Sequence, residues 1–248
     1  MAAEATVKSA EVYGKRTYKP SLKGQLTDLI YVREEINMKG AESIVEILKI
    51  EGVEFISCFS NSDIINPAAE RGIRTILARQ ERVAVDIANG YARVSNGTKI
   101  GVCAMKEAVG IQNAYSEIGQ AFSDSVPILA IPGQGRRVRA GVLPEYFDCG
   151  KAFQPITKWI ECINHANRVP ELLRRAFTYI KTGRPGPVVL ELPRDVSPED
   201  LTDEFRYKKV EGWKTTANAY TFLHVLYCVH SGVSMRPIIL RYTRRTCS

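Results

Sequence analysis

Residues 100–131 read IGVCAMKEAVGIQNAYSEIGQAFSDSVPILAI, which is a strand-helix-strand pattern. Short and nearly unbroken apolar runs stand at 100–105 and 126–131, as in strands that are buried on both faces of a sheet. Between them, apolar residues recur at the spacing of a helix face: Ile111, Ala114, Tyr115, Ile118 and Ala121. The pattern predicts two parallel strands joined by a right-handed crossover through a helix over about 110–122.

Helical patterns also stand on both sides of this unit. One begins after Met38 and stops at Gly52, and another covers 81–95 and ends at Asn96-Gly97. A late helix has Pro170 in its first turn. Its apolar residues are expected to face inward: Leu172, Leu173, Ala176, Phe177 and Ile180.

Three further short runs, over 53–59, 75–78 and 188–192, are expected to be buried strands. Alternating strands and helices of this kind predict an α/β fold, with three layers (α/β/α) around a mainly parallel sheet. Ligands of such folds bind beyond the carboxyl ends of the strands. The residues to inspect therefore follow the strands: 60–63, 80–81, 106–113 and 133–139.

Composition and charge exclude several classes of protein. The chain has 248 residues, of which 45% are hydrophobic and 25% charged, so disordered, collagen-like and disulfide-scaffold proteins are disfavoured. No apolar run approaches the roughly 20 residues that span a bilayer, and residues 1–20 lack the apolar core of a secretory signal. We expect a cytoplasmic protein, with an organellar location left open.

The net charge of +7 belongs to one part of the chain. Residues 205–248 carry eight basic residues and one acidic residue, whereas the other 204 residues carry 26 of each. A basic domain that binds nucleic acid is therefore not indicated for the main part of the chain. The sequence divides into an N-terminal extension (1–37), a domain (38–204) and a basic tail without a recognised motif (205–248).

The cysteines do not indicate a metal site. None forms a CxxC pair, and zinc sites need clustered soft ligands. We expect no metal ligands and free, mostly buried thiols at Cys58, Cys103, Cys149, Cys162, Cys228 and Cys247.

Four candidates for chemistry stand after or between the expected strands. Glu81 is expected at the start of a helix. It is either a carboxylate that binds a ligand or an acid that only interacts favourably with the helix dipole. Spacing alone favours the interaction with the helix dipole. The segment Gly133-Gln134-Gly135, with Arg136, Arg137 and Arg139, is similar to a phosphate loop but has Val138 where GxGxxG needs glycine. Arginines on a solvated loop are the favoured interpretation. Asp124 is expected to cap a turn, and His165 to be structural.

A series of short motifs follows in a specific order. They read MKGAE (38–42), EGVE (51–54), RQE (79–81), NGYAR (89–93), AFSDSVP (121–127), PGQ (132–134), GRPGPV (183–188) and LPRDV (192–196). In order and spacing, residues 38–200 resemble the N-terminal pyrimidine-binding domain of thiamine-diphosphate enzymes of the acetolactate synthase type.

The resemblance implies a site and a cofactor. Glu81 matches the family glutamate that hydrogen-bonds the pyrimidine nitrogen of thiamine diphosphate and so promotes formation of the reactive ylide. Gly110 and Asn113 match two further positions of the cofactor site. In the family, magnesium and the diphosphate are held by a separate domain with a G-D-G motif, and FAD, where present, by another domain. This sequence has no Gly-Asp pair and is expected to lack both domains.

The sequence also departs from the family pattern. Residues 108–113 read AVGIQN in place of G-P-G-A-x-N, and Phe59–Asp63 replaces a loop rich in proline and glycine. Phe147-Asp148 stands near the place of a family Phe-Gln pair. These changes leave the reaction and the substrate open.

The first function hypothesis is a thiamine-diphosphate-binding subunit or fragment of an acetolactate synthase-like transferase or lyase that acts on 2-oxo acids. It is expected to be inactive alone and to pair with a second copy or with a diphosphate-binding domain. The alternative is a non-catalytic interaction domain that retains the fold and the dimer surface. Nucleic-acid binding through the tail is a third and less favoured hypothesis, and no membrane partner is expected.

Overall fold

The structure is a computed structural model that describes residues 38–142, 146–210 and 214–215. The predicted extension over 1–37, most of the predicted tail, and Cys228 and Cys247 lie outside the described residues.

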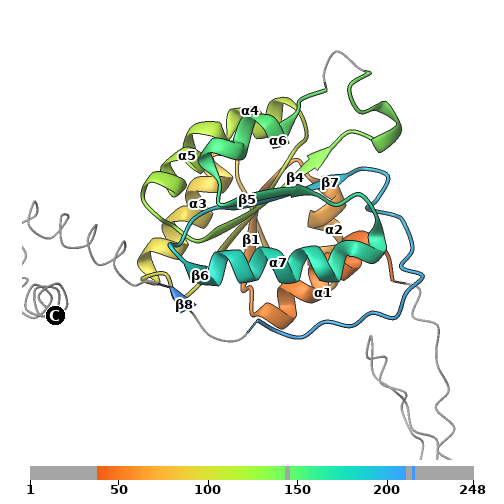
Figure 1. Ribbon diagram of the computed structural model, residues 1–248, viewed down its shortest axis with the longest axis horizontal. Coiled ribbons are helices and arrows are strands. Elements are labelled where there is room, and N and C mark those ends of the chain that lie inside the picture. Colours follow the sequence, from red (N-terminus) through yellow and green to blue (C-terminus); the bar gives the residue numbers. More distant parts are fainter. Residues whose placement is uncertain (1–37, 143–145, 211–213, 216–248) are drawn as a thin grey trace, which may run out of the picture. The chain divides into compact units, whose positions relative to one another are not determined.

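Six parallel strands form the central sheet, in the order β2-β1-β3-β4-β7-β5 (Figure 1). Their bounds are β1 Phe55–Phe59, β2 Arg74–Leu77, β3 Gly101–Met105, β4 Ile128–Gln134, β5 Trp159–Cys162 and β7 Val188–Pro193. Two short strands, β6 Thr182–Gly183 and β8 Lys214–Thr215, pair separately.

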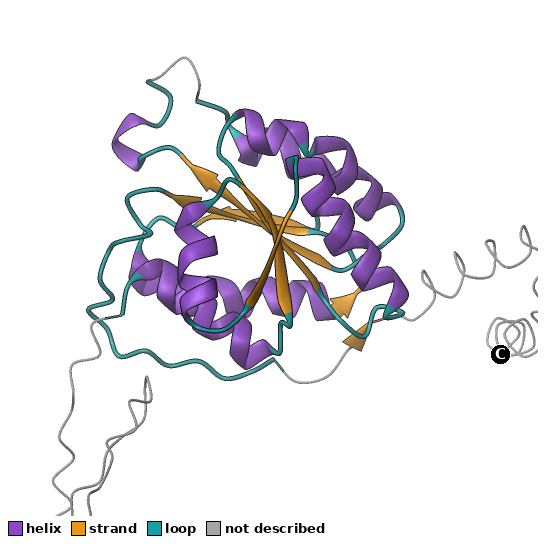
Figure 2. Ribbon diagram, turned by 180° about the vertical axis from the view of Figure 1, so that it is seen from behind, coloured by secondary structure: helices purple, strands orange, loops and turns teal. Residues whose placement is uncertain are grey.

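Helices cover both faces of the sheet (Figure 2). One face carries α1 Gly40–Glu51, α2 Ser62–Glu70 and α7 Val169–Lys181, and the other carries α3 Glu81–Val94, α4 Val109–Asn113, α5 Tyr115–Ser123 and α6 Cys149–Phe153. Alternate residues of the central strands belong to opposite cores: in β3, Val102 packs on the α1 side and Cys103 on the α3 side. The predicted three-layer α/β/α fold with a parallel sheet is confirmed.

Some local predictions were wrong. Strand β2 is not buried on both faces, because it lies at the edge of the sheet, where Leu77 is 73% exposed. The helix predicted over 110–122 is two helices, α4 and α5, that meet at Ala114. The pattern also missed α2, which contains Pro67, and the four-residue edge strand β5.

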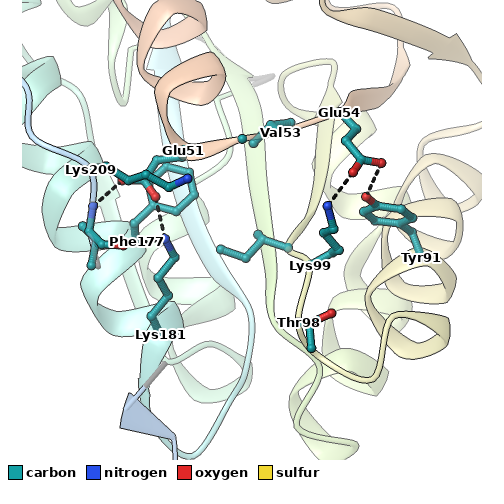
Figure 3. Close-up of a pocket in the computed structure, with 12 residues that line it drawn as sticks. Glu51, Val53, Glu54, Tyr91, Thr98, Lys99, Phe177, Lys181 and Lys209 are labelled. Carbon is teal, nitrogen blue, oxygen red and sulfur yellow. Dashed lines mark hydrogen bonds and ion pairs between the residues drawn. The ribbon is translucent and has the colours of Figure 1, made fainter. Parts of the chain in front are cut away.

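A buried ion pair joins α1 to α7 at the amino ends of the strands (Figure 3). Lys181 Nζ lies 2.6 Å from Glu51 Oε2, and both side chains are shielded from solvent. The other oxygen of Glu51 accepts hydrogen bonds from the Tyr207 hydroxyl (2.6 Å) and the Val210 amide (2.8 Å). Burial and the Glu51 carboxylate raise the pKa of Tyr207. This Glu51 cluster fastens residues 207–210, the first part of the predicted tail, to the core.

The turn between β3 and α4 has an unusual backbone. Ala108 adopts φ +53° and ψ −107°, a region that glycine enters freely and that costs other residues about 1–3 kcal/mol. This turn leads into the helix that carries Gly110 and Asn113.

Replacing Lys181 tests the Glu51 cluster. Lys181→Met would leave a buried carboxylate without its counter-charge, so we expect the free energy of unfolding in urea to fall by about 3–5 kcal/mol. The control is Lys49→Met, because Lys49 forms an exposed pair with Glu46 at 4.0 Å and should change stability by less than about 1 kcal/mol. Equal effects of the two substitutions would contradict the role given to the cluster.

Replacing Ala108 tests the strain in the turn. Ala108→Gly should raise the free energy of unfolding by about 1 kcal/mol, because relief of the backbone strain exceeds the entropy that glycine adds to the unfolded chain. Ala140, exposed and at φ −58° and ψ 124°, provides the control. There glycine should lower stability by about 0.4–1 kcal/mol. Destabilisation by both substitutions would rule out strain at Ala108.

Candidate functional site

Three residues singled out from the sequence meet at the carboxyl ends of the strands. Glu81 is the first residue of α3, while Gly110 and Asn113 lie in α4. Asn113 Nδ2 donates a hydrogen bond to Glu81 Oε2 at 2.9 Å. The structure therefore brings together all three residues, which lie up to 32 positions apart in the sequence.

The Glu81 carboxylate is nearly buried, with 8% of the residue exposed. Helix α3 holds it there because α3 packs closely on the sheet. A side chain at Gly101 of β3 would place its Cβ 2.0 Å from the carbonyl oxygen of Ala88. Ser57 Oγ of β1 donates to the Ala84 carbonyl at 2.6 Å. These two contacts fix the depth of the helix whose first residue is Glu81.

Gly110 lets α4 pack closely against the second carboxylate oxygen. A Cβ at this position would lie 2.9 Å from Glu81 Oε1 and 2.9 Å from the Cβ of Lys106. Both distances are shorter than real Cβ contacts, so a side chain here would displace the carboxylate. Asn113 thus binds one oxygen of Glu81. The other oxygen lies where a side chain at position 110 would clash with it.

Residues 108 and 109 depart from the family pattern, and the structure places them differently. Ala108 carries the strained backbone described above, whereas Val109 is 68% exposed at the start of α4. The bulk of Val109 is therefore mainly on the surface and is not packed into the core. The departure that affects the site most is the backbone strain at Ala108.

Asn61 is a positioning residue to which the sequence analysis gave no role. It is buried in the loop after β1, and its Nδ2 donates to the carbonyls of Met105 (3.1 Å) and Ile131 (3.2 Å). It thereby joins the carboxyl end of β3 to the middle of β4 and fixes where the 106–113 turn begins. Its place directly after a strand was the only signal in the sequence.

The arginines after Gly133-Gln134-Gly135 do not share one environment. Arg137 bonds Asp195 and Glu199, each at 2.9 Å, so it is a structural contact although its side chain is still 37% exposed. Arg136 and Arg139 are exposed, as expected. Gln134 is buried at the end of β4, and its amide donates to the Phe147 carbonyl at 3.2 Å.

Two other candidates have structural roles. Asp124 does more than cap a turn, because it forms an ion pair with Arg93 of α3. His165 Nδ1 lies 2.9 Å from Glu199 Oε1 and 3.3 Å from the Asn167 amide, which fits the structural role expected of it.

Glu191 of β7 is a buried carboxyl that the sequence analysis missed. It is 7% exposed, and its Oε1 has no hydrogen-bond partner among the described residues. Burial raises its pKa, against smaller opposing effects of the Cys149 thiol and the Gln134 amide. It lines a cavity of about 310 Å³ together with Gln134 and Cys162.

The described cysteines are free thiols: Cys58, Cys103, Cys149 and Cys162. Burial raises the pKa of Cys103, so this thiol is unreactive. Within the described residues, no group of three or more His, Cys, Asp or Glu side chains is arranged to hold a metal ion. No helix in the same part of the chain is long and apolar enough to cross a membrane.

Another cavity in the described residues lies at the opposite end of the sheet from Glu81. It measures about 510 Å³, and its charged side chains other than Lys209 pair with one another (Figure 3). Glu54 accepts from Tyr91 at 2.7 Å and lies 2.5 Å from Lys99, while Glu51 pairs with Lys181. Because these charges already have partners, this cavity is a weaker candidate site than the carboxyl end.

Comparison with known proteins agrees with the geometry. Residues 38–159 match the family model "Thiamine pyrophosphate enzyme, N-terminal TPP binding domain". A probable acetolactate synthase large subunit of Methanocaldococcus jannaschii is 34% identical over 171 residues, which are 67% of this chain and 29% of the relative.

Bacterial and plant relatives match the same part of the chain. The acetolactate synthase large subunit of Haemophilus influenzae is 32% identical over 192 residues, 74% of this chain and 33% of the relative. The chloroplastic acetolactate synthase of Arabidopsis thaliana is 34% identical over 166 residues, 65% of this chain and 24% of the relative. The chain thus spans about a quarter to a third of these relatives. Through residues 38–159, it belongs to the thiamine pyrophosphate enzyme family, with an N-terminal TPP-binding domain similar to that of acetolactate synthases.

Proposed function

We propose that this chain binds the pyrimidine half of thiamine diphosphate as a subunit or fragment of an acetolactate synthase-like enzyme. The observation that carries the proposal is the Glu81 carboxylate, buried at the carboxyl end of the sheet and held by Asn113. The enzyme would act on 2-oxo acids, breaking or forming a carbon–carbon bond next to the carbonyl.

The residues at this site suit the cofactor. Gly110 packs so closely on Glu81 Oε1 that a single Cβ there would clash with it. A ring with a basic nitrogen that reaches this carboxylate can share a proton with it. When bound, thiamine diphosphate supplies the electron sink for the carbon–carbon chemistry. Glu81 holds the proton, Asn113 orients the carboxylate, and Gly110 permits the close packing of α4 on Glu81.

The proposed site also needs groups that bind magnesium and the diphosphate. The chain spans about a third or less of the matched relatives, and its described residues contain no cluster suited to a metal ion. From the family resemblance, we propose that magnesium and the diphosphate are bound by a diphosphate-binding domain outside residues 38–204, and that residues 38–204 have no activity without it. Such a domain would complete the site, and a second copy of the chain is a further expected partner.

A non-catalytic interaction domain is the second candidate function. The observation that favours it is the turn before α4, where Ala108 holds a backbone conformation suited to glycine. If the strained turn has lost its place against the cofactor, the fold and a pairing surface remain. Cofactor binding separates the two functions.

Calorimetry with thiamine diphosphate and magnesium tests the proposed function. We expect weak binding by the chain alone and tighter binding when a diphosphate-binding domain of an acetolactate synthase is added. Glu81→Gln removes a charge-assisted hydrogen bond of about 1.5–3 kcal/mol, so it should weaken binding about 10–100-fold.

The matched control is Glu46→Gln on the exposed face of α1, which should leave binding unchanged. No binding with the added domain, or equal binding by both variants, would favour the interaction domain. Turnover of pyruvate by the purified chain alone would contradict the proposed need for a partner.

A further inference from the structure

Unpaired arginines gather at one place in the structure. Among the described residues, five guanidinium groups have no hydrogen bond or ion pair within the molecule. They belong to Arg74, Arg79, Arg136, Arg139 and Arg194. Three of them, Arg136, Arg139 and Arg194, line one cavity of about 200 Å³. The others occupy separate positions on or just after β2.

This arginine cavity shares a turn with the Glu81 site. Its wall includes Glu107 and Ala108, and the same turn continues to Gly110 beside the carboxylate. The turn lies close to the end of β4, because a Cβ on Gly133 would be 3.4 Å from the Glu107 amide nitrogen. A ligand in the cavity would therefore lie next to the turn that shapes the cofactor space.

The segments that carry the three arginines are fastened at their backbones. The Arg194 amide donates to the Gln134 carbonyl at 3.0 Å, and the Arg137 amide donates to Asp195 Oδ1 at 3.1 Å. The Arg137 side chain adds its pairs with Asp195 and Glu199. One arginine of the segment thus holds the loop in place, and its neighbours remain free to bind a ligand.

The charge of the cavity favours an anion. Among the described residues that line it, Glu107 is the only acidic one and three are arginines. Asp63 lies near enough to attract Arg194, and burial raises the pKa of Asp63 against that attraction. Arginine binds carboxylates and phosphates through two parallel N–H donors.

We propose that this arginine cavity binds the carboxylate of the 2-oxo acid substrate, an inference that rests on the function proposed above. Its volume lies below the range of roughly 300–1,000 Å³ that is typical for larger ligands, which favours a small acid. Ala108 offers an apolar surface for a short side chain of the acid. The carboxylate would be held by the arginines while its carbonyl group faces the turn at 108–110.

Ligand-detected NMR of pyruvate with the 248-residue chain, without cofactor and at fixed ionic strength, tests this inference. We expect pyruvate to bind and its methyl ester, which lacks the carboxylate, not to bind. Arg139→Gln and Arg194→Gln should each weaken pyruvate binding about fivefold. Arg74→Gln removes an equally exposed and unpaired arginine outside the cavity, so it should change the affinity less than twofold.

Three results would overturn the inference. One is the absence of pyruvate binding, and another is equal weakening by Arg74→Gln and Arg139→Gln, which would indicate a general charge effect. The third is tenfold tighter binding of inorganic phosphate than of pyruvate, which would assign the cavity to a phosphorylated ligand. Unfolding curves of the variants should match that of the parent chain, because these exposed side chains form no hydrogen bond or ion pair with the described residues.

The test is independent of the one for the cofactor. Loss of thiamine diphosphate binding with pyruvate binding retained would remove the proposed function but keep an anion site. Loss of pyruvate binding with thiamine diphosphate binding retained would contradict only the anion site proposed for the arginine cavity.

Discussion

The close approach of α3 to the sheet is the constraint on which the site depends. Gly101 permits it, since a Cβ there would overlap the Ala88 carbonyl, and the Ser57 hydroxyl ties the helix to β1. This packing fixes the position of the start of α3 relative to the sheet, and therefore the position of Glu81. The carboxylate then meets Asn113 and Gly110 because α4 begins a short turn after β3.

The two ends of the sheet differ in how their charges are satisfied. At the amino ends, Glu51 and Glu54 each have a lysine partner and a tyrosine hydroxyl donor. Among the described residues at the carboxyl ends, Glu191 has an oxygen without a hydrogen-bond partner, and Arg136, Arg139 and Arg194 form no ion pair. Paired charges stabilise a fold, whereas polar groups left without partners are available to a ligand. The polar groups without partners and the strand topology therefore indicate the same end of the sheet for a ligand site.

Much of the fold could be predicted because its signals are local. The apolar runs at 100–105 and 126–131 and the apolar face of α7 need no knowledge of distant residues. Strand β5 and helix α2 were missed because they are short and have weak periodicity, and the edge position of β2 depends on strand order. Helix ends could be predicted from proline and glycine residues such as Gly52, which adopts φ +86° at the end of α1.

The site was predictable only in part. Spacing alone did not distinguish Glu81 from an ordinary helix-start acid, and the family resemblance selected it together with Gly110 and Asn113. The contacts of Asn61 and the partners of Arg137 join segments between 44 and 70 residues apart in sequence, so no local pattern reveals them. The unpartnered oxygen of Glu191 is likewise a property of the packed structure, not of its neighbours in the chain.

In the proposed complex, the Glu81 carboxylate shares a proton with the pyrimidine ring of thiamine diphosphate. Nitrogen-15 NMR of cofactor labelled in that ring tests this, with the chain and an added diphosphate-binding domain at concentrations that bind most of the cofactor. We expect a large shift of one ring-nitrogen resonance on binding, as for a nitrogen that gains a proton or a strong hydrogen bond. Bound cofactor whose ring-nitrogen resonances stay at their free positions would contradict it.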